Sequence, residues 1–189
     1  MSTTTVELFY GILALIAFLA VGLLIVLRLA ALASEGAAGA WASVAMMIAP
    51  NALTMAWVVA LFATAGSLYF SEVAGFEPCT LCWYQRIAMY PLVVILAIAA
   101  SRRERSGAIY GAALAAVGAV IAAYHVALEW FPALDSGACD PDNPCTLLWF
   151  RVFGFISLPT LALAAFLLIL TLLAIRITHH ADQTERRTT

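Results

Sequence analysis

The feature that most constrains this chain is a series of five apolar stretches, each long enough to cross a lipid bilayer as a helix. About 20 apolar residues in a helix span the hydrocarbon core. The first stretch runs from Leu8 to Leu27 without a charge. Hydrophobic residues make up 65% of the chain and charged residues 11%, whereas soluble domains are about 45–50% apolar. The predicted fold class is therefore an all-α membrane protein.

The other predicted elements follow from where charges, Pro and Gly interrupt the apolar sequence. The segment before the first stretch carries no Lys or Arg, so we expect a retained anchor and not a cleaved signal peptide. Pro50-Asn51 should divide the next long run into an interfacial piece and a helix. The expected elements are a Gly/Ala linker at 34–40, helices at about 52–70, 79–100, 106–128 and 152–175, and a polar tail from 176. Small residues at four-residue steps should let a neighbouring helix approach the 106–128 helix closely: Gly107, Gly111, Ala115 and Ala119.

Arginine placement predicts how the chain is oriented in the membrane. All nine basic residues are arginines, and they form no stripe of the kind that binds nucleic acid. Cytoplasmic loops are enriched in basic residues. Placing the turn at 102–105 in the cytoplasm leaves only Arg86 and Arg151 on the outer side. This orientation puts the N-terminus outside, the C-terminus inside, and all four cysteines on the outer face.

A Cys-x-x-Cys motif, Cys79 to Cys82, lies where a polar loop meets the third apolar stretch. Pro78 suits the first position of a helix, because its missing N–H would have no partner there. A helix that begins near Pro78 would place its positive dipole end beside both sulfurs, which favours thiolate. Arg86 would lie one turn, about 5.4 Å, deeper than Cys82. A charge at that depth is costly, which indicates a functional role.

Three interpretations of the four cysteines remain open from spacing alone. Two structural disulfides are possible, but the Cys79–Cys82 loop is so short that closing it removes little chain entropy. A four-thiolate zinc site is possible, although five residues separate Cys139 from Cys145 and a long hairpin separates the two pairs. The third interpretation is two redox-active dithiols that exchange electrons. Thiols in electropositive surroundings are usually reactive, which favours the third interpretation.

The residues around the motif resemble the disulfide bond formation protein B family (DsbB), in particular its short Gram-positive branch, BdbC. The stretch Cys-Trp-Tyr-Gln-Arg at 82–86 is the most specific part of the resemblance. It covers about 52–175, in which the Cys-x-x-Cys precedes the second cysteine pair. Vitamin K epoxide reductase-like proteins have the opposite cysteine order. A quinone reductase of that kind and a non-enzymatic scaffold with structural disulfides are the alternative functions.

The resemblance implies a function and roles for individual residues. Such proteins reoxidise an extracytoplasmic thioredoxin-like (DsbA-type) oxidase and pass the electrons to a membrane quinone, menaquinone or ubiquinone, and so to the respiratory chain. By this likeness, the partner attacks a Cys139–Cys145 disulfide, with Cys139 favoured. The Cys79–Cys82 disulfide then reoxidises that pair. Cys82 meets the quinone, Arg86 holds a quinone oxygen, and no metal takes part.

Other polar residues near the cysteines carry weaker predictions. His125 and Glu129 are spaced i, i+4 near the outer end of their helix, and they could line the quinone pocket and relay protons. Asp140 and Asp142 should disfavour thiolate in the loop pair. The predicted organisation is an extra transmembrane helix and linker (1–40), a DsbB-like four-helix redox domain (41–178) and a polar cytoplasmic tail (179–189). The resemblance also places the protein in the bacterial cell (inner) membrane, with multiple passes.

Overall fold

The computed structural model describes residues 2–188 except residue 136; for Arg105 and for 180–188 it describes the course of the backbone alone. Within that range the regular elements are helices, and five helical stretches are long and apolar enough to cross a membrane. The predicted all-α membrane fold is therefore confirmed. The six α-helices are α1 (Thr3–Ala30), α2 (Glu35–Ile48), α3 (Ala52–Leu68), α4 (Thr80–Arg102), α5 (Arg105–Trp130) and α6 (Leu158–Thr188).

The long second apolar run is divided at Pro50, as predicted. A 3₁₀ turn at Ala49–Asn51 joins α2 to α3. However, the predicted linker at 34–40 is wrong, because α2 begins at Glu35. Ser34 caps this helix, its hydroxyl oxygen accepting a hydrogen bond from the Ala37 N–H. The cap and the alanines that follow it outweigh the two glycines in the segment.

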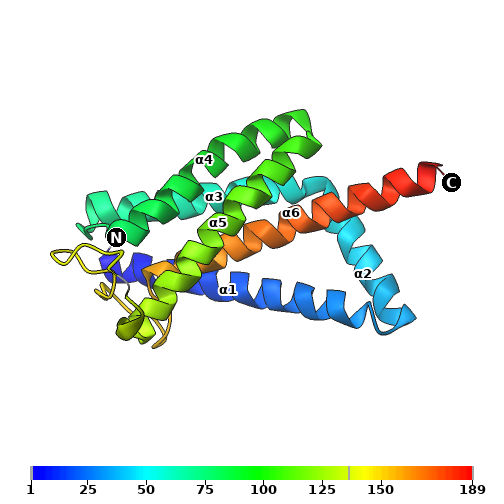
Figure 1. Ribbon diagram of the computed structural model, residues 1–189. Helices are drawn as coiled ribbons and strands as arrows, with labels where there is room; N and C mark the ends of the chain where they lie inside the picture. The colour runs from blue at the N-terminus through cyan, green and yellow to red at the C-terminus, as the bar shows by residue number, and fades with distance from the viewer. Residues whose placement is uncertain (1, 136, 189) are drawn as a thin grey trace.

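Helices α3 to α6 form a four-helix bundle, and α1 lies alongside α6 on its outside (Figure 1). Leu92, Leu96 and Phe166 are fully buried in the bundle core. The close approach predicted for α5 is confirmed, because a Cβ added at Gly107 would lie 2.3 Å from the Ala99 Cβ. In the same way, Leu96 packs against Gly111 and Phe166 packs against Gly118.

The last helix begins later and ends later than the sequence predicts. Residues 152–157 form a turn, and α6 begins at Leu158 and not at 152. Phe153 has a φ of 53° and Gly154 a φ of 79°, both incompatible with a helix. The backbone of α6 continues through the predicted polar tail to Thr188. Since no Gly or Pro follows Pro159, nothing in the local sequence stops the helix where the apolar residues end.

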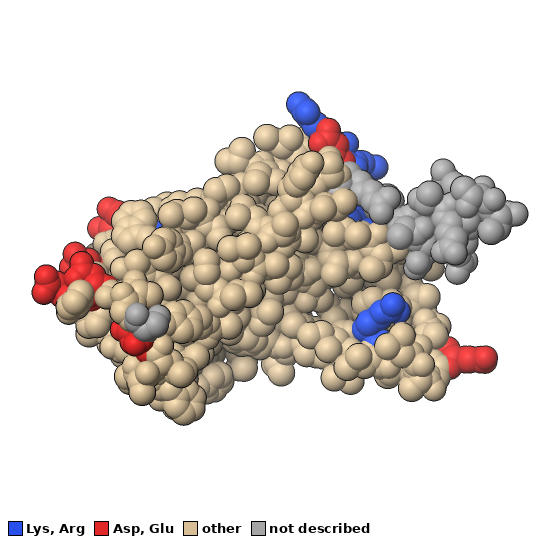
Figure 2. All heavy atoms as spheres, viewed as in Figure 1, with Lys and Arg blue, Asp and Glu red and all other residues tan. Residues whose placement is uncertain are grey.

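The two ends of the molecule differ in composition. The N-terminus, the start of α4, the end of α5 and the following loop gather at one end of the bundle (Figure 1). On the face shown in Figure 2, the charged atoms at that end are mainly acidic, the opposite end carries arginines together with a few acidic side chains, and a wide uncharged band separates the two ends. All four cysteines lie at the end that carries the acidic loop.

Candidate functional site

The site begins at the first turn of α4. This helix starts at Thr80, so Pro78 precedes the N-cap and does not occupy the predicted first helical position. Cys79 is the N-cap: its backbone is extended, and its sulfur accepts the Cys82 N–H at 3.4 Å. The helix starts after Pro78 and Cys79 because the Cys79 sulfur accepts the hydrogen bond that a side-chain oxygen usually accepts at the N-cap. The expected position of a sulfur at the positive end of the helix is found at Cys79.

The two cysteine pairs lie together in different covalent states. The sulfurs of Cys79 and Cys82 are 2.8 Å apart and unbonded. Cys139 and Cys145 are joined by a disulfide, with their Cα atoms 5.8 Å apart. All four belong to one packed cluster around Leu128. This proximity allows exchange between the pairs.

One side chain of the loop attaches it to the start of α4. The Asn143 side-chain amide donates to the Pro78 carbonyl at 3.3 Å. Within the loop, the Asn143 N–H donates to the Asp140 carbonyl, and the Asp142 N–H donates to the Asp140 carboxylate. The residues between the two loop cysteines therefore form a hydrogen-bonded turn. Together with the Asn143 contact, this turn keeps the Cys139–Cys145 disulfide next to Cys79 and Cys82.

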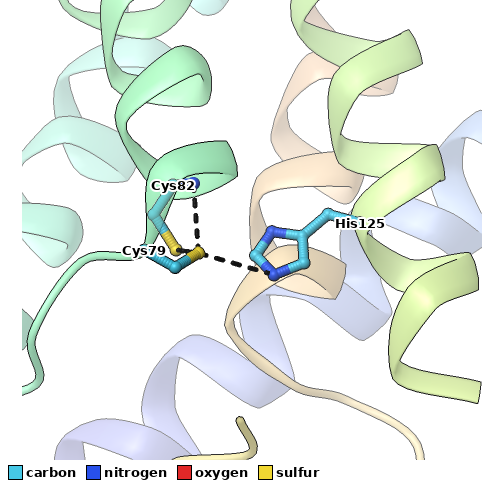
Figure 3. Close-up of side chains that lie close together, drawn as sticks. All are labelled: Cys79, Cys82 and His125. Carbon is cyan, nitrogen blue, oxygen red and sulfur yellow. Dashed lines mark hydrogen bonds between the residues drawn. The ribbon is translucent and has the colours of Figure 1, made fainter. Parts of the chain in front are cut away.

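His125, on α5, points toward Cys79 (Figure 3) and also contacts the backbone of Cys145. Its Nε2–H donates to the Cys145 carbonyl at 3.0 Å and lies 3.8 Å from the Cys79 sulfur. Its Nδ1 accepts a hydrogen bond from the Gln85 amide at 3.1 Å. Because Gln85 donates to Nδ1, the ring proton is placed on Nε2, toward the sulfur. His125 and Gln85 are both buried.

These contacts favour the ionised form of Cys79. The hydrogen bond with Cys82 is the largest influence, and it lowers the pKa of the Cys79 thiol well below its usual range. Burial opposes this effect, and the hydrogen bond and charge of His125 lower the pKa further. In the reduced pair the negative charge is therefore favoured on Cys79, the sulfur nearer the loop disulfide and His125.

His125 and Glu129 lie apart from the larger cavity that Arg86 lines, and their expected place in a quinone pocket stays a prediction. Both lie beside a narrow crevice that also contains Cys79 and Cys82. Glu129 accepts a hydrogen bond from the Ser157 hydroxyl, which in turn contacts the Thr160 hydroxyl at 3.0 Å. The face of α5 that carries His125 and Glu129 is directed toward the loop and the start of α6, and so away from the larger cavity.

A second and larger space lies on the other side of the dithiol. It is a mainly apolar cavity of about 500 Å³, with walls from α1, α3, α4 and α6. Pockets that bind drug-sized ligands have about 300–1,000 Å³ and a few polar groups. Here Cys82, Gln85 and Arg86 supply polar atoms along α4, whereas Cys79 is not part of the wall.

Arg86 is held in the wall of this cavity by α3. Its Nε donates to the Ser67 hydroxyl and its Nη2 to the Ser67 carbonyl, both at 3.0 Å. The guanidinium also lies over the Trp83 ring, 5.2 Å from its centroid. Among the described residues no carboxylate forms an ion pair with it. The cavity thus has a positively charged wall one helical turn below Cys82.

Two further residues of the site were not identified from the sequence. Gln85 sets the orientation of the His125 ring, and Ser67 holds Arg86. Gln85 is three residues from Cys82, and a neutral polar residue within an apolar stretch is a signal that could have identified it. Ser67 carries no comparable signal, because its role depends on how α3 packs against α4.

Cys79, Cys82 and His125 could also bind a soft metal ion. Their ligand atoms lie within 4.8 Å of one another, and thiolate and imidazole are the usual zinc ligands. The four-thiolate zinc site considered above lacks two of its ligands here, because Cys139 and Cys145 are bonded to each other. The expectation that no metal takes part stays a prediction.

Comparisons with known proteins show the family to which the chain is related. The sequence model of the family described as "Disulfide bond formation protein DsbB" matches residues 49–176. A "Probable disulfide formation protein" of Oceanobacillus iheyensis is 43% identical over 126 residues, covering 66% of this chain and 87% of that protein. The "Disulfide bond formation protein C" of Bacillus subtilis is 46% identical over 119 residues, covering 62% of this chain and 86% of that protein.

The matched region contains the bundle and all four cysteines but not α1. The family match begins at residue 49, just before α3. No solved structure matches the chain significantly. The extra first helix predicted from the sequence therefore lies outside the region that the family model matches.

Proposed function

This chain belongs to the DsbB family of disulfide bond formation proteins, and on that premise we propose that it is a quinone-dependent membrane thiol oxidase. Family membership makes it a membrane oxidoreductase of disulfide bond formation. The proposal adds two specific parts. Electrons enter from an extracytoplasmic thioredoxin-like (DsbA-type) oxidase, and they leave to a membrane quinone.

One observation carries the proposal: the Cys79–Cys82 dithiol separates two different spaces. On one side Cys79 packs with the loop disulfide. On the other side Cys82 and Arg86 line the apolar cavity. A sulfur pair in this position can take electrons from a protein dithiol and deliver them to an apolar acceptor. A purely structural disulfide needs neither space.

The first half-reaction is disulfide exchange at the loop. A partner thiolate attacks a sulfur of the Cys139–Cys145 bond, and the partner's second thiol then resolves the mixed disulfide. The partner becomes a disulfide, and the loop pair gains two electrons and two protons. Cys139 is 9% exposed and Cys145 only 1%, which supports attack at Cys139.

The second half-reaction transfers the same two electrons inward. The reduced loop pair attacks a Cys79–Cys82 disulfide, which re-forms the Cys139–Cys145 bond and leaves Cys79 and Cys82 as thiols. The structure has this distribution, with the loop pair bonded and the inner pair free. His125 stabilises the charge on Cys79 once that sulfur leaves the disulfide as a thiolate, because its Nε2 lies 3.8 Å from the sulfur.

The cavity fits a quinone in size and polarity. When bound, menaquinone or ubiquinone supplies an acceptor for two electrons and two protons. Arg86 would hold one quinone oxygen, since its guanidinium lies in the wall without a carboxylate partner among the described residues. Donors fixed where negative charge develops are an effective source of rate enhancement. Cys82 would face the ring from one turn above.

The proposed orientation places the cysteine end outside the cytoplasm of a bacterial cell. The last turns of α1 and α4, which carry Arg28 and Arg102, lie at the opposite end from the loop that follows α5 (Figure 1), which matches the positive-inside rule. A DsbA-type partner would then reach the loop, and the respiratory chain would reoxidise the quinone. Protease cleavage of a C-terminal tag should occur only in inverted vesicles; cleavage in right-side-out vesicles would contradict this orientation.

Quinone reduction by the purified protein tests the proposal. The full chain in lipid nanodiscs is supplied with menaquinone and a reduced thioredoxin-like oxidase, and quinone absorbance is followed. We expect oxidation of the partner and loss of quinone absorbance in a one-to-one ratio. Cys82→Ser should reduce the rate to background. Equal rates for Cys82→Ser and the unaltered protein would refute the proposal.

A further inference from the structure

The helix outside the shared family region forms part of the cavity. Tyr10, Leu13, Ala17 and Ala20 of α1 follow one another at helical spacing along the wall. They face cavity residues of α3 and α6. Because the family match begins at residue 49, this wall is a feature of the present chain and not of the matched region.

Helix α1 is attached firmly to α6 along one side. Ala14 and Ala17 are buried in a cluster with Ile156 and Ala164 of the α6 region. A Cβ added at Gly11 would lie 3.0 Å from a Val152 methyl group. The helix is therefore packed as a fixed wall and is not a loosely associated anchor.

The contact of α1 with α3 is made by Tyr10, at the cysteine end. The Tyr10 hydroxyl donates to the Phe62 carbonyl at 3.2 Å. Its ring lies so close to Gly66 that a Cβ there would be 2.6 Å from it. Since Ser67 follows Gly66 and holds Arg86, Tyr10 closes the cavity at the level of the proposed headgroup site.

Further from the cysteines, the space between α1 and α3 has exposed apolar edges. Ile16 is 57% exposed, Phe62 49% and Val58 38%, and all three line the cavity. Ala20 lies ten residues beyond Tyr10, about 15 Å along the helix. The cavity thus extends from a polar end beside Arg86 to an apolar opening that faces the lipid.

We propose that α1 is a specificity-determining wall that binds the prenyl tail of the lipid quinone. The headgroup lies beside Tyr10 and Arg86, and the tail follows Leu13 and Ala20 toward the opening between α1 and α3. This inference rests on the proposed function, because it assigns a tail-binding surface to the same acceptor cavity. It predicts that changes in α1 discriminate between quinones with and without a tail.

Adjacent residues of α1 provide a matched pair of variants for the test. Ala20→Trp adds bulk inside the cavity, whereas Leu19→Trp adds it at a position that is 65% exposed and outside the cavity wall. The full-length protein is assayed with dithiothreitol as electron donor and with either menaquinone or the tail-less duroquinone. The background rate of Cys82→Ser is subtracted in each case.

We expect Ala20→Trp to lower kcat/KM for menaquinone about ten-fold, since it displaces roughly two methylene groups of the tail. Its activity with duroquinone, and both activities of Leu19→Trp, should stay within about two-fold of the unaltered protein. Leu13→Ala, which adds no bulk, should raise KM for menaquinone but not for duroquinone. Equal effects of Ala20→Trp and Leu13→Ala on both quinones would overturn the inference. If the unaltered protein consumes neither quinone above background, the proposed function itself fails.

Discussion

The two cysteine pairs of this protein have opposite structural settings. Cys79 and Cys82 lie at the start of a long helix, unbonded, between a histidine and an apolar cavity. Cys139 and Cys145 lie in a loop and are bonded to each other. A helix end holds sulfurs in a fixed position relative to a ligand, whereas a loop can present a bond to another protein. The proposed function assigns the two pairs different tasks: the loop pair would meet the protein partner, and the helix pair would meet the quinone.

Removing one pair at a time should have the largest effect and should separate the two tasks. Without Cys139 and Cys145 (both changed to Ser), oxidation of the thioredoxin-like partner should be lost, while dithiothreitol still drives quinone reduction through the inner pair. Without Cys79 and Cys82, both activities should be lost. Quinone absorbance with each donor measures the difference. If the loop variant lost both activities, the division of tasks would be wrong.

Changing Arg86 should affect only the side of the dithiol that faces the cavity. We expect Arg86→Ala to lower kcat/KM for quinone by about 10²–10³, because it removes the positive charge in the cavity wall. The rate of exchange between the cysteine pairs should be unchanged. This rate is measured by adding one equivalent of partner and quenching samples at short times. Arg86→Lys is the control, which keeps the charge and should recover part of the rate. Slower exchange in Arg86→Ala would contradict the separation of the two spaces.

His125 should control the pH dependence of Cys79. The lowered pKa keeps this thiol ionised at pH values at which an ordinary thiol, with a pKa of about 8.5, is protonated. Alkylation of Cys79 should therefore change little as the pH falls from the alkaline to the mildly acidic range. In His125→Ala the pKa should rise, so that alkylation at mildly acidic pH slows roughly ten-fold. Both proteins carry Cys82→Ser as a common background, in which the serine hydroxyl keeps a hydrogen-bond donor beside Cys79, so the difference between them reports on His125.

A second variant, at Gln85, tests whether the orientation of the His125 ring proton matters in the same experiment. Gln85→Glu retains an acceptor but not the amide donor that sets the ring proton on Nε2. It should change the pH profile of alkylation without abolishing it. Identical profiles for His125→Ala and the reference protein would show that the histidine does not act on Cys79.

The smallest effect is expected where the loop is attached to the helix. Asn143→Ala removes the hydrogen bond to the Pro78 carbonyl, a contribution of about 1 kcal/mol. Exchange between the pairs should slow about three- to ten-fold, whereas quinone reduction driven by dithiothreitol should not change. Asn143→Asp, which lacks the amide donor, should behave like Asn143→Ala. If Asn143→Ala slowed only quinone reduction driven by dithiothreitol, the proposed division of tasks between the two pairs would be wrong.

Much of the fold was predictable because a bilayer restricts the possible structures. A backbone in hydrocarbon must satisfy its own hydrogen bonds, so long apolar runs become helices. Pro50 and the small residues of α5 were therefore correctly interpreted. The predictions were wrong where composition was ambiguous: the Gly/Ala linker is helical, and the polar tail continues α6. In both segments the helix forms because no strong breaker interrupts it.

The candidate site was predictable only along a single helix. Cys79, Cys82 and Arg86 are related by helical spacing, so their relative depth follows from the sequence. His125 was identified from the sequence, and its place near the acceptor stays a prediction; only the structure shows that it lies between the two cysteine pairs. Its position depends on the packing of α5 against α4, which helical spacing within either segment does not specify.

The sequence alone determined that the chain is a helical membrane protein, which residues share the first turns of α4, and that both cysteine pairs lie at the same end of the molecule. These follow from local rules, namely helix periodicity, the thickness of the bilayer and the position of charges. Only the tertiary structure decided that Cys82 faces a cavity and Cys79 faces the loop, that Ser67 holds Arg86, and that α1 forms a wall of the cavity. A cavity is a space left between several helices, so it exists only once their packing is set.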